Sequence, residues 1–151
     1  MDMITPHRSN WLTVVPEIHE ELFEFWNQIS PPKGLPTRDS FTEDDLERWP
    51  GHLHLVELID DDDAKFIVYG SAVGELHGRD WTGKRFSETE YEDSKTLLGY
   101  YHDVRDARRP LAHVVNASVE SKYRRWSRLF IPFADDADSI RYIMVHSVLI
   151  E

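Results

Sequence analysis

Residues 122–150 read KYRRWSRLFIPFADDADSIRYIMVHSVLI, two apolar runs separated by an acidic stretch. In the first run Leu129, Ile131 and Phe133 recur at every second position, which is the period of a β-strand. The second run, 140–150, is apolar on both of its alternating faces. One face of a sheet built from these strands covers the core, so the other has to be hidden by the amino-terminal helix or by a second subunit.

Working outward from these runs, the chain predicts a pair of strands, then helices, then a triplet of strands. A strand at 112–119 completes the triplet, and the earlier pair lies at 53–59 and 65–69 on either side of an acidic turn. A pair and a triplet of strands separated by helices predict an α+β fold, with an antiparallel sheet and helices on one face.

The segment between the two groups of strands predicts a short helix and then a long one. In the short helix, within 70–78, we expect Val73 and Leu76 to point inward. The long helix is expected to begin near residue 87 and to end before Pro110. Four residues form its expected start: the cap Ser87, its capping-box partner Glu90, and the packing pair Phe86 and Tyr91.

Residues 1–34 are expected to form an amino-terminal extension with one helix, and residues 35–151 the main domain. Pro16 suits the first turn of that helix. Apolar residues then recur at three- and four-residue spacing, which predicts one strongly apolar face. The members of this face are Ile18, Leu22, Phe25, Trp26 and Ile29.

The composition limits the classes of function. The chain has 151 residues, and 28 acidic residues against 17 Lys and Arg give a formal net charge of −11. A surface of that charge repels phosphate backbones, so we expect no nucleic-acid partner. The absence of cysteine excludes disulfides, cysteine-ligated zinc and cysteinyl-flavin photochemistry. No apolar stretch approaches the roughly 20 residues that cross a bilayer, so we expect no membrane association and a cytoplasmic location.

Several segments resemble a subfamily of short, stand-alone bacterial PAS-like proteins. The most specific is the turn Asp80-x-Thr82-Gly83, in which Asp80 can accept backbone N–H groups and Gly83 permits a positive φ. None of the matching motifs is catalytic. The other matches are Leu35–Arg38 with Phe41 and Leu46, Phe66–Val73, and Arg128–Phe133.

The resemblance implies a five-stranded antiparallel sheet in the order 2-1-5-4-3, with helices across one face and an extra amino-terminal helix. A ligand cavity in such a fold would lie between the sheet and the long helix. The same residues can equally pack as a solid core. The candidate cavity residues are Tyr69, Leu76, Phe86, Leu98, Tyr101, Leu129 and Val145.

The opposite face of the sheet is a candidate interface. Strand alternation places Trp126 and Arg128 on one side of their strand, which we expect to face solvent or a partner. The functional alternative is that this face meets the amino-terminal helix of a partner, as in a homodimer. The interface candidates are Leu22, Phe25, Trp26, Trp126, Tyr142 and Met144.

Histidines and aspartates are the candidate metal ligands. His52-x-His54 has the spacing of a chelating pair on one strand face, but no third ligand is near, so we expect no metal there. His102 is the haem candidate, because haem-binding PAS domains carry a histidine on the corresponding helix; His77 is second, and a boundary histidine is the alternative. The run Asp60–Asp63 lacks the glycine and distant glutamate of a calcium loop and predicts a hairpin turn.

We therefore expect a stand-alone PAS-type sensory or signalling module that binds a small ligand, a protein partner or both. Haem or another small organic compound is compatible with the sequence, and none is demanded. The signal is expected to pass through a homodimer or a separate signalling protein. The alternative is a pure interaction module with a filled core and no small ligand. No phosphate-binding glycine loop, nucleophile elbow or paired-carboxylate motif predicts an enzyme.

Overall fold

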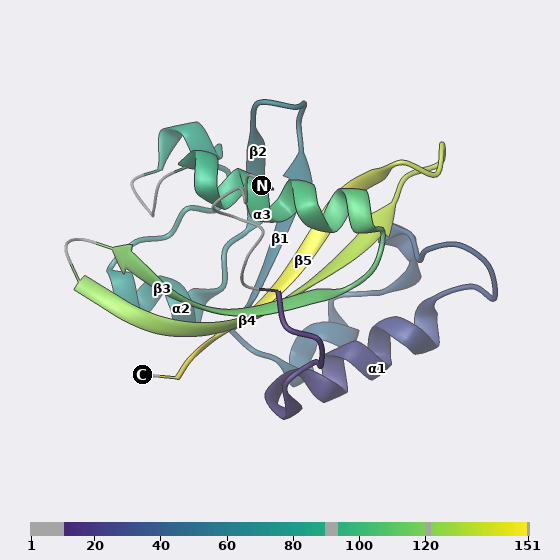
Figure 1. Cartoon of the computed structure of the whole chain (residues 1–151), viewed down its shortest axis with the longest axis horizontal. Coiled ribbons are helices and arrows are strands. Elements are labelled where there is room, and N and C mark those ends of the chain that lie inside the picture. The colour runs from purple at the N-terminus through teal and green to yellow at the C-terminus, as the bar shows by residue number, and fades with distance from the viewer. Residues whose placement is uncertain (1–10, 90–93, 120–121, 151) are drawn as a thin grey trace, which may run out of the picture.

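The computed structural model describes residues 11–89, 94–119 and 122–150. Five strands form one antiparallel sheet in the order β2-β1-β5-β4-β3, and helices lie on both of its sides (Figure 1). The predicted α+β fold and strand order are confirmed. The strands are β1 (Leu53–Leu58), β2 (Ala64–Val68), β3 (Leu111–Val119), β4 (Lys122–Ala134) and β5 (Ile140–Leu149); the helices are α1 (Glu20–Ile29), α2 (Ser71–His77) and α3 (Ser94–Ala107), with 3-10 turns η1 (Glu17–His19), η2 (Arg38–Ser40), η3 (Asp44–Arg48) and η4 (Phe86–Glu88).

Each face of the sheet carries its own hydrophobic core. Toward α3, Phe130 of β4 and Val145 of β5 are buried in one cluster with the inner side chains of the helix. Toward α1, Leu129 and Met144 of the same two strands are buried in a second cluster. This explains why β5 is apolar on both faces: α1 of the same chain covers the side that α3 does not.

Two predictions about β4 were wrong. Leu129 was expected to line a cavity beneath the long helix, but it lies in the cluster on the α1 side. Trp126 and Arg128 do share one side of the strand, yet that side faces α3, and both residues are buried rather than exposed. Because helices cover both faces, the two-residue period alone could not say which face met which helix.

The helices also depart from the sequence pattern in three places. Leu76 of α2 is 43% exposed, so it does not point inward as Val73 does. Ile18 is 49% exposed, and His19 takes the buried position beside it, because the 3-10 turn η1 precedes α1 and changes the phase of the helix. Ser87 lies in η4 instead of capping the long helix, while Glu90 and Tyr91 fall outside the described residues.

The predicted hairpin turn at Asp60–Asp63 is confirmed, and its last residue also bonds to Ser87 of η4. Asp63 Oδ2 accepts the hydroxyl of Ser87 at 2.6 Å, and its Oδ1 lies 3.3 Å from the Ser87 amide nitrogen. The carboxylate therefore ties the β1–β2 hairpin to η4, which begins at the deeply buried Phe86. Within the described residues, no helix is long and apolar enough to span a bilayer.

The outer edge of β2 is occupied by backbone of the same chain. The Phe66 amide donates to the Lys84 carbonyl at 2.9 Å, and the Gly83 amide donates to the Phe66 carbonyl at 2.7 Å. The Tyr69 amide in turn donates to the Thr82 hydroxyl at 3.1 Å. The turn that follows α2 thus lies along this edge and closes it to a further strand.

Candidate functional site at the end of strand β2

Tyr69 follows directly after β2 and forms the floor of the candidate site. Its ring stacks on His54 of β1, with centroids 4.3 Å apart and an angle of 20° between the planes. Phe66 and Trp81 meet the same ring edge-on at 5.0 Å and 5.5 Å. Three aromatic contacts hold the ring in one orientation, so it forms a rigid floor.

His54 also fixes the backbone at the start of α2. Its Nδ1 accepts the Gly70 amide at 2.9 Å, and a neutral imidazole that accepts at Nδ1 carries its proton at Nε2. Gly70 is buried, and a Cβ at this position would lie 2.5 Å from the Gly51 carbonyl oxygen. The bond between Gly70 and His54 therefore fixes the position at which α2 begins.

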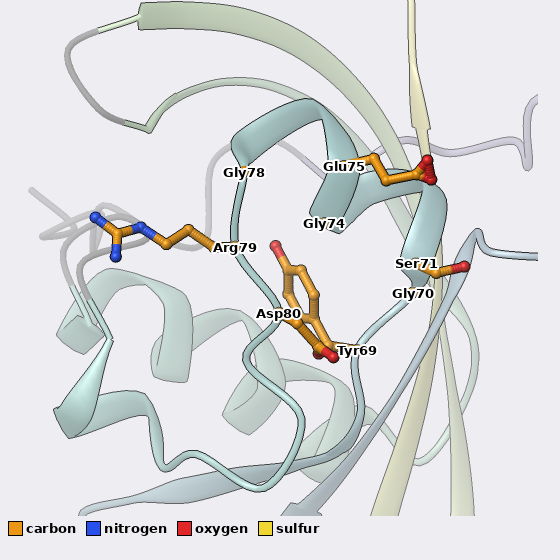
Figure 2. A pocket seen from close by; sticks show the side chains of 8 residues that line it. All are labelled: Tyr69, Gly70, Ser71, Gly74, Glu75, Gly78, Arg79 and Asp80. Carbon is orange, nitrogen blue, oxygen red and sulfur yellow. The ribbon is translucent and has the colours of Figure 1, made fainter.

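A pocket of about 540 Å³ opens between α2 and the segment that follows it. Figure 2 shows the Tyr69 ring between the helix and this segment, with its hydroxyl end between Gly74 and Arg79. Arg79 and Glu75 extend to opposite sides, so backbone forms much of the wall. The residues that line the pocket are Tyr69, Gly70, Ser71, Gly74, Glu75, Gly78, Arg79 and Asp80.

Asp80 lines the outer end of the pocket, and the predicted geometry of the Asp80–Gly83 turn is confirmed. Asp80 Oδ1 accepts the Thr82 amide at 3.0 Å, and the hydrogen bonds from the Thr82 backbone and side chain lower the pKa of Asp80 below its ordinary value. Gly83 has a φ of +84°. Asp80 is therefore an exposed carboxylate, held in place at the rim of the pocket.

Gly74 allows α2 to approach the segment after it. A Cβ at Gly74 would lie 2.5 Å from the Arg79 carbonyl oxygen, and this oxygen belongs to backbone that cannot simply rotate away. The Arg79 amide donates to the Gly74 carbonyl at 3.0 Å, so the same two residues also close the helix end. The spacing Gly70, Gly74 and Gly78 is the sequence signal that could have located this pocket.

We expect Gly74→Ala to lower the free energy of unfolding by about 1–3 kcal/mol, the usual cost of forcing an extra methyl group into a filled site. Urea denaturation followed by circular dichroism measures the change. Ser71→Ala is the matched control, because Ser71 is exposed on the same short helix. Equal stability of the Gly74→Ala protein and the wild type would contradict the close approach of helix and turn.

The other predicted cavity residues gather in the interior below α3. Phe86, Leu98, Tyr101 and Val145 belong to one buried cluster. Its rings touch in sequence: Phe66 to Phe86 at 4.7 Å, Phe86 to Tyr101 at 5.1 Å, and Tyr101 to Phe130 at 5.2 Å. These contacts fill the layer between this part of α3 and the sheet.

The haem candidate does not fit this interior. His102 is half-buried on α3, and its neighbour Tyr101 fills the space beneath the helix through its contacts with Phe86 and Phe130. A macrocycle would have to displace these rings. The side chain of His77 lies outside what the structure describes.

The pair His52 and His54 is not arranged as a chelate. His54 Nδ1 already accepts the Gly70 amide, and His52 Nδ1 lies 3.3 Å from the Ser147 carbonyl oxygen, which accepts its proton. In the part of the chain that the structure describes, no three His, Asp or Glu side chains are grouped to hold a metal ion.

A buried histidine pair that the sequence did not predict fastens the amino-terminal helix to the sheet. His19 Nδ1 lies 2.8 Å from His146 Nδ1, and His19 Nε2 lies 2.8 Å from the Ser127 hydroxyl oxygen. Burial lowers the pKa of His19 to about 3 and that of His146 to about 4, helped by the positive charges of neighbouring histidines. The partners are 127 positions apart, so no local pattern could reveal the pair.

The candidate interface residues on this side are buried within one chain. Leu22, Phe25 and Trp26 of α1 pack against Met144, and Tyr142 lies at the edge of the same cluster. The Trp26 indole also donates to the Pro132 carbonyl at 2.9 Å. The amino-terminal helix, and not a second subunit, therefore hides the second apolar face of the sheet.

Comparison with protein families finds that the model of the PAS domain matches residues 15–145. The match includes α1 as well as the whole sheet. No curated protein sequence matches the chain significantly.

Comparison with solved structures finds several light-oxygen-voltage domains. One such domain, studied with a flavin analogue, is 7% identical with a TM-score of 0.54, over 72% of this chain and 83% of that one. The photo-excited blue-light photoreceptor Vivid is 17% identical with a TM-score of 0.50, over 88% and 95%. The blue-light photoreceptor Aureochrome1 is 7% identical with a TM-score of 0.50, over 74% and 90%. At these identities the likeness concerns the fold.

Proposed function

Because the chain belongs to the PAS domain family, whose fold is that of sensory and signalling modules, we propose that it senses a small polar ligand at the Tyr69 pocket. The observation that carries the proposal is the pocket of about 540 Å³ on a rigid aromatic floor. Its volume falls within the roughly 300–1,000 Å³ of ordinary small-molecule sites.

The chemistry of the lining favours a small ligand with hydrogen-bonding or cationic groups. Tyr69 is 3% exposed, so its ring closes the floor and offers little open surface, and the Asp80 carboxylate at the rim offers a negative charge. Backbone groups beside the glycines add short-range hydrogen-bonding partners. PAS domains are typically sensory rather than catalytic, and the proposal includes no reaction.

A few direct contacts connect the pocket to the sheet and to the amino-terminal helix, so a bound ligand could change how this helix packs. Tyr69 stacks on His54 of β1, and β1 pairs with β5, which carries His146. His146 bonds to His19 at the start of the amino-terminal helix. A ligand that shifts Tyr69 would thereby bias the packing of α1, which is the element offered to a homodimer or a separate signalling protein.

The test uses the purified protein and a panel of metabolites. Native mass spectra compared with denaturing spectra would reveal a dissociable compound, and thermal shifts would identify compounds that stabilise the fold. Tyr69→Phe keeps the ring contacts and removes only the hydroxyl, so we expect the affinity for the compound to fall about 3- to 10-fold. Tyr123→Phe, at a tyrosine that is 78% exposed, is the matched control.

A second candidate is a pure interaction module with no small ligand. The ring-to-ring contacts from Phe66 to Phe130 favour it, because they leave the described interior filled. A bare mass in native spectra, together with no thermal shift from any compound, would support this candidate over the sensor. Sedimentation would then show whether the partner is a second copy.

A further inference from the structure

A second groove adjoins the candidate ligand pocket and shares Tyr69, Gly70 and Ser71 with it. It has a volume of about 630 Å³ and runs between η3 and the end of β2. A second hollow of about 180 Å³ continues it and shares four of its lining residues. The four shared residues are Glu43, Leu46, Leu53 and Val68.

The floor of the groove is apolar. Leu53 and Trp49 are buried, and Leu46 is half-buried against the same cluster. Val68, the last residue of β2, is 47% exposed. An exposed β-branched apolar side chain beside other apolar groups marks a surface whose burial by a partner is favourable.

The rim of the groove is acidic and not neutralised. Glu43 and Glu47 are exposed, and neither carboxylate makes an ion pair or a hydrogen bond with another described residue. The nearby cations are held elsewhere: Arg48 lies over the Trp49 ring at 4.6 Å, and Arg38 lies over the Tyr142 ring at 5.6 Å. The two carboxylates thus remain available to a cation from outside the chain.

We propose that this groove binds a segment of a partner protein in which Lys or Arg residues flank apolar side chains. Apolar side chains of the segment cover Val68 and Leu46, and its cations meet Glu43 and Glu47. The net charge of −11 attracts such a segment and repels both acidic partners and a second copy of the chain. The edge of β2 is already bonded to residues 83–84, so the segment docks through side chains and not as an added strand.

The probe is a fluorescein-labelled amphipathic peptide of arginine and leucine, titrated with the full chain and followed by fluorescence anisotropy. We expect micromolar binding that weakens as salt rises. Glu43→Lys with Glu47→Lys should weaken binding about tenfold, because two attractions become repulsions. Val68→Lys should weaken binding by a comparable factor, because it removes an apolar contact from the floor of the groove. Thermal melts followed by circular dichroism check that each variant is folded.

The matched control is Glu20→Lys with Glu24→Lys, which makes the same change of net charge on exposed residues of α1. Equal weakening by the control would show attraction to the overall charge and overturn the assignment. Failure of the peptide to bind, equal binding of an uncharged serine–leucine peptide, or dissociation of a dimer by the Glu43→Lys, Glu47→Lys variant would each overturn it as well. The varied residues do not line the Tyr69 pocket, so these results are independent of the ligand tests.

Discussion

Lowering the pH from 7 to 5 should reduce the free energy of unfolding by about 2–4 kcal/mol, because His19 and His146 stay neutral in the fold and become charged when they are released. Burial lowers the pKa of His19 to about 3 and that of His146 to about 4, against about 6.5 for a free imidazole. The hydrogen bond between their Nδ1 atoms requires one protonated and one bare nitrogen, so two imidazolium rings cannot form it.

The sign follows from where each state binds protons. Above pH 6.5 both states carry neutral histidines, and the full stabilisation is present. Below pH 6.5 these histidines become protonated in the unfolded chain but stay neutral in the folded protein. The free energy of unfolding therefore decreases as the pH falls toward the folded pKa values of about 4 and 3. His113 adds to the same trend, because burial and the charge of Arg128 hold its pKa well below the ordinary value.

Urea unfolding at several pH values measures this dependence. His146→Asn is the informative variant, because an asparagine amide can replace Nδ1 as the partner of His19 without titrating. We expect its stability to change with pH by about two-thirds as much as that of the wild type between pH 7 and pH 5, because His19 and His113 remain. A wild-type protein whose stability is flat over this range would show that the pair is not buried as described.

The order of the elements could be predicted from the sequence because each depends on local information. The alternation in 122–150 and the turn at Asp80–Gly83 concern residues that are close in the chain. Periodicity of this kind predicts which segments are strands and helices. It also revealed that both faces of β5 are buried.

The assignment of faces could not be predicted in the same way. With helices on both sides of the sheet, Leu129 and Trp126 each had an apolar surface to meet, and only the three-dimensional packing places one toward α1 and the other toward α3. Of the predicted cavity residues only Tyr69 lines the pocket beside α2, because the sequence predicted a cavity beneath the long helix instead. Burial of a histidine pair is likewise decided by tertiary contacts, which a residue type alone does not encode.

Replacing Trp26 by glutamate should cost about 3–5 kcal/mol, which is the loss expected when a buried aromatic side chain is removed. Trp26 is 8% exposed between α1 and the sheet, and its indole donates to the Pro132 carbonyl. The carboxylate would either lie buried without a partner or pull the helix away from the sheet. Release of α1 would also expose Met144 and Leu129, so the variant should associate more readily than the wild type.

Thermal and urea unfolding measure the loss of stability, and sedimentation velocity measures the association. Asn27→Glu is the matched control, because it places the same charge on the exposed side of the same helix. If the Trp26→Glu protein melted like the control, the packing of α1 on the sheet would not contribute to stability. If it instead converted a wild-type dimer into a stable monomer, Trp26 would lie between subunits, and the covering of β5 by α1 of its own chain would be wrong.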